Sequence, residues 1–232
     1  MSKVYLVPSV LDEQAIETIP AYLIVAVKDC QVIFAENERT TRRFLKSICK
    51  EIVIDDYEWF TIHKAEQEQK DHFRQKINEG KNIAIISEAG CPGIADPGQV
   101  LIELAQQLNV PVKPLVGPSS ILLALMASGM NGQQFEFVGY LPIDMQDRVK
   151  AIKELELTSK KKHSTQIFIE TPYRNNQLLE TLLKTCSANT KICVAAELTG
   201  ANEYVKTKSV ADWKNEKTDF HKKPVIFLLY AQ

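Results

Sequence analysis

The stretch from Ile83 to Ser120 limits the possible folds more than any other part of the sequence. It begins with four uncharged apolar residues, Ile83 to Ile86, which is typical of a strand buried on both faces of a parallel sheet. Ser87 to Gly98 then holds three glycines and two prolines, too many for a regular element. Asp96-Pro97 predicts the start of a helix, with Asp96 as the N-cap and Pro97 at the first helical position.

The same order of elements follows once more. A second strand is expected over 110–116, and Gly117-Pro118-Ser119-Ser120 leads into another apolar helix. Two loops therefore follow two strand ends, and each loop leads into a helix N-terminus. In an open α/β sheet, ligands bind outside the carboxyl ends of the strands. The sequence thus predicts a binding site built from these two loops.

Strand and helix patterns alternate up to Val116, whereas strands dominate after Pro118. This predicts an α/β protein with two α/β domains, 1–116 and 117–232, the first sheet mostly parallel and the second mixed. The last two strands have no long helix between them, so antiparallel pairing is expected. The run 160–163 is expected to be a solvated loop. The other expected strands are 3–7, 31–35, 52–54, 135–141, 165–170, 191–197, 204–207 and 225–230, and the other expected helices are 39–50, 64–78, 147–155 and 175–185.

Composition excludes several classes of protein. With 45% hydrophobic and 25% charged residues, the chain has enough apolar content for a globular core. Its net charge of -1 leaves nucleic-acid binding to local patches. Five cysteines without CxxC spacing argue against a disulfide framework or a zinc site. No signal peptide and no membrane-spanning run is recognised, so we expect a cytoplasmic protein without a metal or a membrane partner.

One helix carries a candidate nucleic-acid surface. Its basic residues recur at helical spacing and would form a stripe able to bind RNA phosphates: Arg39, Arg42, Arg43, Lys46 and Lys50. The alternative is a solvated helix face. His63, beside a polar helix start, is either a further substrate contact or a surface residue.

Six motifs occur in order along the chain. They are SEAGCPGIADPG at 87–98, PLVGPSS at 114–120, ALMASGM at 124–130, FEFVGYLP at 135–142, ETPYR at 170–174 and AAELTGANE at 195–203. Together they resemble the tetrapyrrole methylase superfamily of S-adenosylmethionine (SAM) methyltransferases. The greatest similarity is to its ribosomal RNA branch, the small-subunit rRNA methyltransferase I family, which modifies a cytidine ribose 2′-hydroxyl.

The resemblance implies two α/β domains of the tetrapyrrole methylase (class III methyltransferase) type, with SAM held between them and usually a homodimer. Glycine-rich loops allow the main chain to approach a ligand, and helix N-termini offer N–H groups to a carboxylate. Ile94 is a candidate for apolar packing against the adenine. The cofactor contacts implied by the resemblance are Pro8, Ser87, Glu88, Ala89, Gly90, Gly93, Ile94, Ser119, Ser120, Glu170, Leu198 and Thr199.

Methyl transfer from a sulfonium mainly needs positioning, and a ribose hydroxyl also profits from a nearby base. The candidate catalytic residues are Glu36, Arg39, Glu170, Arg174 and Glu197, with Glu88 beside the cofactor. Each has a structural alternative. Glu36 could cap a helix and pair with Arg39, Glu88 could cap a turn, Glu170 and Arg174 could form a salt bridge, and Glu197 could make a structural hydrogen bond.

The first loop departs from the family pattern, because residues 7–13 contain no glycine. Three functions are therefore compared. The first is a SAM-dependent methyltransferase acting on RNA. The second is a methyltransferase of the same fold acting on a tetrapyrrole or another small molecule, which would need a large apolar cleft and no basic stripe. The third is a protein that binds SAM without catalysis.

Overall fold

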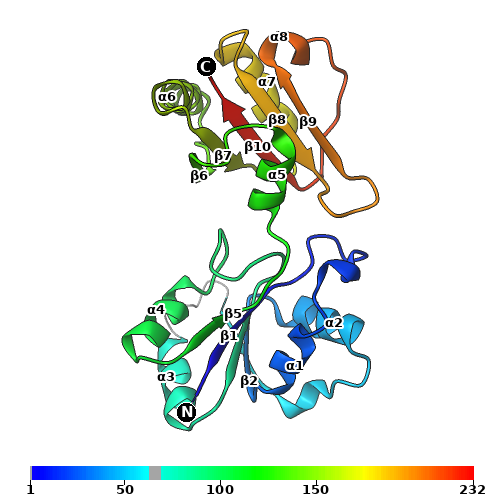
Figure 1. Ribbon diagram of the computed structural model, residues 1–232, viewed down its shortest axis with the longest axis vertical. Coiled ribbons are helices and arrows are strands. Elements are labelled where there is room, and N and C mark those ends of the chain that lie inside the picture. The colour runs from blue at the N-terminus through cyan, green and yellow to red at the C-terminus, as the bar shows by residue number, and fades with distance from the viewer. Residues whose placement is uncertain (1, 63–68) are drawn as a thin grey trace. The chain divides into compact units, whose positions relative to one another are not determined.

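The structure is a computed structural model that describes residues 2–62 and 69–232. The chain divides into two compact units, Met1–Ser119 (unit 1) and Ser120–Gln232 (unit 2) (Figure 1). Each unit is built on a five-stranded sheet with helices packed against it. No helix among these described residues is long and apolar enough to cross a membrane.

The sheet of unit 1 is entirely parallel, with strand order β3-β2-β4-β1-β5. Its strands are β1 (Val4–Val7), β2 (Val32–Ala35), β3 (Glu58–Thr61), β4 (Ile83–Ile86) and β5 (Val112–Pro114). All residues of β2 and β4 are buried, because helices cover both faces of the sheet. Since the strands are parallel, the loops that follow β1, β2 and β4 lie at one edge.

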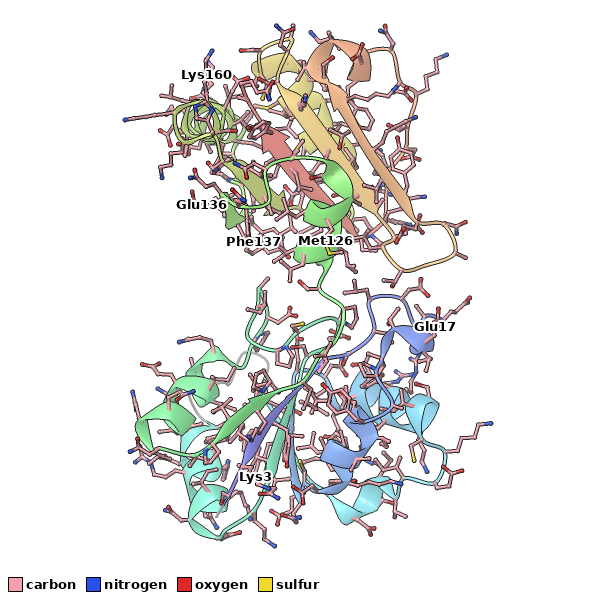
Figure 2. The ribbon with its side chains drawn as sticks, viewed as in Figure 1. Lys3, Glu17, Met126, Glu136, Phe137 and Lys160 are labelled. Carbon is pink, nitrogen blue, oxygen red and sulfur yellow. The ribbon has the colours of Figure 1, made fainter. Side chains whose placement is uncertain are left out.

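Helices lie on both sides of this sheet (Figure 1). One face packs against α1 (Leu23–Lys28) and α2 (Glu38–Ile48), and the other against α3 (Lys70–Asn78) and α4 (Gln99–Gln107). The expected helix at 39–50 is confirmed as α2. Its Asn37 N-cap accepts hydrogen bonds from two backbone N–H groups. Figure 2 shows Lys3 at the amino end of β1, opposite the edge where the loops lie.

Unit 2 has a mixed sheet with strand order β6-β7-β10-β8-β9. Its strands are β6 (Phe135–Tyr140), β7 (Thr165–Ile169), β8 (Lys191–Ala196), β9 (Tyr204–Ser209) and β10 (Val225–Tyr230). The pair β6 and β7 is parallel, whereas the other neighbours are antiparallel. Its helices are α5 (Ser120–Ser128), α6 (Met145–Lys162), α7 (Asn175–Thr185) and the short α8 (Val210–Trp213). The predicted fold class, one parallel and one mixed sheet, is confirmed.

Two predicted elements of unit 1 differ from the structure. The helix expected to start at Asp96-Pro97 begins only at Gln99, after Gly98 adopts a left-handed φ of 119°. The strand expected at 52–54 is absent. Residues Ile54–Asp56 form a 3₁₀ helix there, as Ile16–Thr18 do earlier in the chain. The strand of this region comes later, as β3 at Glu58–Thr61. The helix expected at 64–78 is described only from residue 69 onward, because 63–68 lie outside the described residues.

Two predictions for unit 2 were also wrong. The last two strands, β9 and β10, do not pair with each other, because each pairs with β8 from a different side. The run Lys160 to Lys162 is the last turn of α6 and not a loop, and His163 follows it with a left-handed φ of 51°. Cations at a helix C-terminus interact favourably with the helix dipole, which explains why the helix continues through them.

Candidate functional site

The loop after β4, residues 87–98, is called the glycine-rich loop from here on. Gly90 has a φ of 72°, a conformation that disfavours residues with a side chain. A Cβ at Gly90 would also lie 3.4 Å from Leu11 Cδ2, so the first loop approaches the main chain closely at this point. Ala95 adopts a left-handed φ of 64° without being a glycine. Such backbone conformations cluster at functional sites.

The first loop, residues 7–13, is hydrogen-bonded to the glycine-rich loop. Ser9 N donates to Gly90 O at 2.9 Å, and Gly90 N donates to Ser9 O at 3.2 Å. Ser9 Oγ donates to Ser87 O at 2.8 Å. Pro8 is buried, and a Cβ on Gly117 would lie only 2.2 Å from its Cγ. The first loop is thus fixed by hydrogen bonds to Ser87 and Gly90 and by the close approach of Pro8 to Gly117, although it contains no glycine itself.

Three carboxyl groups gather at this edge of unit 1: Glu36, Glu88 and Asp96, called the acidic cluster. Glu36 Oε2 accepts a hydrogen bond from Glu88 N at 2.8 Å. Asn37 Nδ2 donates to Glu88 Oε1 at 3.3 Å. Burial, together with the charges of Glu36 and Glu88, raises the pKa of Asp96 to about 7. Glu36 does not cap α2, because Asn37 is the N-cap.

Several groups of the glycine-rich loop remain available to a ligand. Ser87 Oγ is buried and has no hydrogen-bond partner in the part of the chain that the structure describes. Ala89 is exposed, and Ile94 is 54% exposed. A carboxylate-rich edge complements a ligand that carries positive charge. Within the described ranges, no group of three or more His, Cys, Asp or Glu side chains could hold a metal ion.

The cysteines play no visible part in this chemistry. All five are free thiols. Burial raises the pKa of Cys30 and of Cys186 to about 12, which keeps both protonated and unreactive. Cys91, inside the glycine-rich loop, contacts Pro118 O at 3.5 Å, and burial raises its pKa as well. The cysteines therefore pack as small apolar side chains.

In unit 2, Glu170 and Arg174 form the predicted pair. Glu170 Oε1 accepts from Arg174 Nη2 at 2.7 Å and from Thr171 N at 2.6 Å, and the Glu170 side chain has no exposed surface. Its Oε2 atom and Arg174 Nε are both buried without a partner among the described residues. The structural salt bridge is present, yet half of the carboxylate remains unsatisfied.

The segment after β8 has an unusual backbone. Glu197 and Thr199 both have left-handed φ values, 51° and 68°. Lys223 Nζ donates to Glu197 Oε2 at 2.6 Å, and Thr199 N donates to Glu203 Oε2 at 2.7 Å. Thr199 Oγ1 is buried without a partner in the described chain, and Leu198 is 8% exposed. This strained turn and an unsatisfied hydroxyl coincide at predicted cofactor-binding residues. Of the remaining predicted contacts, Ser119 directly precedes α5 and Ser120 begins it.

The basic stripe of α2 does not form one free surface. Arg42 pairs with Glu38 and Asp55 and lies over the Trp59 ring at 4.7 Å. Arg43 donates to both carboxylate oxygens of Glu13 at 2.9 Å.

Two further members of the stripe, Arg39 and Lys46, are exposed and form no ion pair among the described residues. Arg39 is exposed, and Lys46 Nζ donates to Lys50 O at 3.1 Å. His63 lies outside the described residues. The predicted RNA surface is therefore partly neutralised by acids of the same chain.

Sequence reasoning missed Asp96 as a site residue, because it read Asp96 as a helix cap. Ser9 and Asn37, which hold the two neighbouring loops, were missed as well. The available signal was the position of Asp96 between Gly93 and Gly98, since a carboxylate inside a glycine-rich loop need not belong to the following helix.

The sequence matches the family Tetrapyrrole (Corrin/Porphyrin) Methylases over residues 17–213. A curated relative, "Ribosomal RNA small subunit methyltransferase I" of Buchnera aphidicola subsp. Schizaphis graminum, is 30% identical over 230 residues, covering 97% of this chain and 76% of the relative. The protein of the same name from Bacillus subtilis is 30% identical over 220 residues, covering 93% and 71%. The crystal structure of the methyltransferase CobJ has a TM-score of 0.66 at 14% identity, covering 99% of this chain and 93% of that one. That last likeness concerns the fold alone.

Proposed function

The chain belongs to the tetrapyrrole (corrin/porphyrin) methylases and, within them, to the ribosomal RNA small subunit methyltransferase I family, and from this we propose that it transfers a methyl group from SAM to RNA. We assign the acceptor to a ribose 2′-hydroxyl of small-subunit rRNA. The structural observation that carries the proposal is the acidic cluster, in which Asp96, inside the glycine-rich loop, has a pKa raised to about 7 by burial and by the charges of Glu36 and Glu88.

The residues of unit 1 fit SAM in chemical type. Ser87 Oγ is buried without a partner among the described residues and can hydrogen-bond a polar group of the cofactor. Ala89, beside it in the glycine-rich loop, is exposed. Ile94 supplies exposed apolar surface for a purine ring. Glu36 and Glu88 can hold positive charge, which SAM carries on its sulfonium and its amino group. When bound, SAM supplies an electrophilic methyl group.

The other predicted cofactor contacts stay predictions under this proposal. In unit 1 they are Pro8, Ala89, Gly93 and Ser119, and in unit 2 they are Ser120, Glu170, Leu198 and Thr199. The unsatisfied Glu170 Oε2 and Thr199 Oγ1 support the unit 2 assignments, since buried polar atoms normally have a partner.

In the proposed mechanism, Asp96 accepts the proton of the attacking hydroxyl. A general base works best when its pKa lies near the working pH, and the pKa of Asp96 is about 7. The hydrogen bond from Glu88 N to Glu36 fixes one of the two carboxylates that, after burial, raise the pKa of Asp96. Arg39, exposed in the first turn of α2, is proposed to contact an RNA phosphate. Glu170, Arg174 and Glu197 are proposed to position the reactants.

The same resemblance supports two finer proposals. We propose that the protein acts as a homodimer and that it works in the cytoplasm, where ribosomal subunits assemble. Sedimentation analysis of the purified chain tests the first, because a mass of one chain at micromolar concentration contradicts it. Cell fractionation tests the second.

A titration calorimeter tests cofactor binding with SAM and with its demethylated product. We expect saturable binding by the wild type and by Gly132→Trp, a control glycine with open space around it, and none by Gly90→Trp. Absence of binding by the wild type would refute the methyltransferase assignment.

Transfer of labelled methyl groups to small-subunit rRNA is the second step. Transfer to a tetrapyrrole and not to RNA would favour the small-molecule alternative. Binding of SAM without transfer to either acceptor would favour the protein that binds SAM without catalysis.

A further inference from the structure

Unit 1 carries a groove of about 720 Å³ along the uncovered side of β5, between that edge strand and α1. It is separate from the acidic cluster, because none of the three acidic-cluster residues lines it. One end reaches Lys3 and Lys28, at the amino edge of the sheet, and the other reaches Tyr22 and Leu115. Its lining combines three lysines, two tyrosines and apolar side chains.

The lysines leave the groove positively charged. Lys3, Lys28 and Lys113 are all exposed, and among the residues that the structure describes neither Lys28 nor Lys113 forms an ion pair. Asp29 is the one acidic residue in the lining. Glu51 lies close enough to Lys28 to interact electrostatically with it. An anionic ligand therefore finds more positive than negative charge here.

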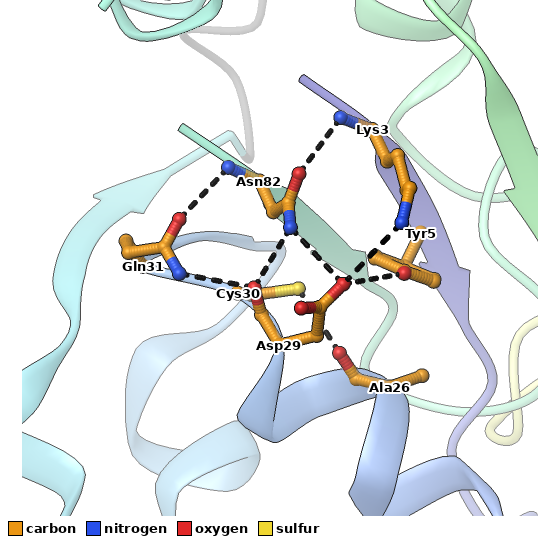
Figure 3. Close-up of polar contacts among 7 residues, drawn as sticks. All are labelled: Lys3, Tyr5, Ala26, Asp29, Cys30, Gln31 and Asn82. Atoms are coloured by element: carbon orange, nitrogen blue, oxygen red, sulfur yellow. Dashed lines mark hydrogen bonds and ion pairs between the residues drawn. The ribbon is translucent and has the colours of Figure 1, made fainter. Parts of the chain in front are cut away.

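Asp29 organises one end of the groove through neutral donors (Figure 3). Its Oδ2 atom accepts from Tyr5 Oη at 2.7 Å and from Asn82 Nδ2 at 3.0 Å, whereas Lys3 Nζ is 3.9 Å away. The hydrogen bond from Tyr5 to Asp29 raises the pKa of Tyr5 to about 12, so the tyrosine remains a donor. Lys3 forms only a long, exposed ion pair with Asp29, which leaves its ammonium group able to contact a ligand as well. Lys113 is the strand partner of Tyr5 and lines the same side.

The opposite end offers an aromatic platform. Tyr22 is 46% exposed, and its hydroxyl is fixed by a hydrogen bond from Val116 N at 2.7 Å. Val25, one turn later on α1, is 68% exposed. A partly exposed ring that lines the groove and is held by its hydroxyl suits a stacked base, because every base has a π-face.

The edge strand itself argues against a protein strand as the occupant. Pro111 directly precedes β5 and Pro114 ends it, with Lys113 between them. Proline has no N–H to donate, and proline and lysine on an edge strand discourage pairing with another strand. Lysines beside an exposed aromatic ring are instead the combination found in grooves that bind single-stranded nucleic acid.

We propose that the groove between α1 and β5 binds a single-stranded segment of RNA, with Lys3, Lys28 and Lys113 on phosphates and Tyr22 under a base. The proposal rests on the proposed function, since it names a second contact for the same RNA substrate. It differs from the α2 stripe, whose arginines are partly neutralised within the chain.

Fluorescence anisotropy with a labelled single-stranded oligoribonucleotide tests the groove. The charge reversal Lys3→Glu, Lys28→Glu, Lys113→Glu is compared with a matched reversal of three exposed lysines of unit 2: Lys184, Lys191 and Lys214. The logarithm of the affinity falls linearly with the logarithm of the salt concentration. We expect the steepness of this line to be smaller by about 2 in the groove variant, about 0.7 for each lost phosphate contact. The control should keep the wild-type slope. Tyr22→Leu should bind about tenfold more weakly, whereas Tyr22→Phe, which keeps the ring, should not.

Each outcome bears on a different claim. If the wild type methylates RNA and the groove variant binds RNA with an unchanged salt dependence, the proposal that the groove binds RNA is refuted and the proposed function stands. If the wild type binds SAM but neither binds nor methylates RNA, both fail. SAM titration of the groove variant verifies that it folds. A loss of dimer mass together with unchanged RNA affinity would assign the groove to a second copy of the chain and refute the proposal.

Discussion

Replacing Asp96 with Asn should abolish methyl transfer. It should also make unit 1 more stable than in the wild type, by an amount that grows as the pH rises. The reason is the cost of ionising a carboxyl group that is partly buried beside two carboxylates, Glu36 and Glu88. The pKa of Asp96 is about 7 in the folded chain, against an ordinary value of 3.8. Asn keeps the size and polarity of the side chain without the charge.

The sign follows from proton binding. Because the folded-state pKa is raised, the protonated carboxyl favours folding fully below about pH 4, and this contribution is lost as the pH rises through about 7. The difference between the two pKa values corresponds to about 4 kcal/mol, and solvent screening of a partly exposed group reduces it to about 2 kcal/mol. Of this, about 1 kcal/mol falls between about pH 5 and about pH 8.

Urea unfolding of the wild type and Asp96→Asn at several pH values measures the effect. We expect the free energy of unfolding of the variant to rise relative to the wild type by about 1 kcal/mol over that range. Glu103→Gln, an exposed carboxyl on α4, should stay within about 0.5 kcal/mol at every pH. A difference between variant and wild type that does not change with pH would refute the argument. Full transfer activity in a variant that binds SAM would refute the assignment of Asp96 as the base.

Two further substitutions test the packing and the charge pair described above. Gly117→Ala should lower the free energy of unfolding by about 1–3 kcal/mol, because its Cβ would lie 2.2 Å from Pro8 Cγ; thermal melting should show Gly132→Ala, in open space, unchanged. Glu170→Gln should cost about 1–3 kcal/mol, because Arg174 loses its anion. Urea unfolding that matches the wild type would mean that this pair contributes nothing to stability.

The sequence predicted those helices and strands whose residue pattern lies entirely within the element itself. The run Ile83 to Ile86 is uncharged and became the fully buried β4, and Asn175–Thr185 became α7 with the predicted bounds. The strand β3 was missed because it is half exposed at a sheet edge and has no continuous apolar run. The order of the second sheet was also beyond local reasoning, since β10 is last in the chain yet lies between β7 and β8.

The candidate site shows the same limit on a smaller scale. The glycine-rich loop could be predicted because its glycines and prolines are adjacent in sequence. The contact between Glu36 and Glu88 joins residues 52 positions apart, and no spacing rule connects them. Asp96 was read as a helix cap, since Asp-Pro is a common helix start. The left-handed Gly98 delays the helix to Gln99 and leaves Asp96 in the loop with the other carboxylates.

The glycine-free first loop gives the last step of this argument. A glycine allows a neighbouring loop to approach its main chain closely, because it has no Cβ. A close contact between two loops needs a glycine in only one of them, and either loop can supply it. Here Gly90 and Gly117 stand opposite Leu11 and Pro8 and leave the space that those side chains fill. Ser9 then adds a buried hydrogen bond from Oγ to Ser87 O, which a glycine at that position could not make. The loop without glycine is therefore attached to the glycine-rich loop by a side-chain hydrogen bond in addition to the main-chain ones.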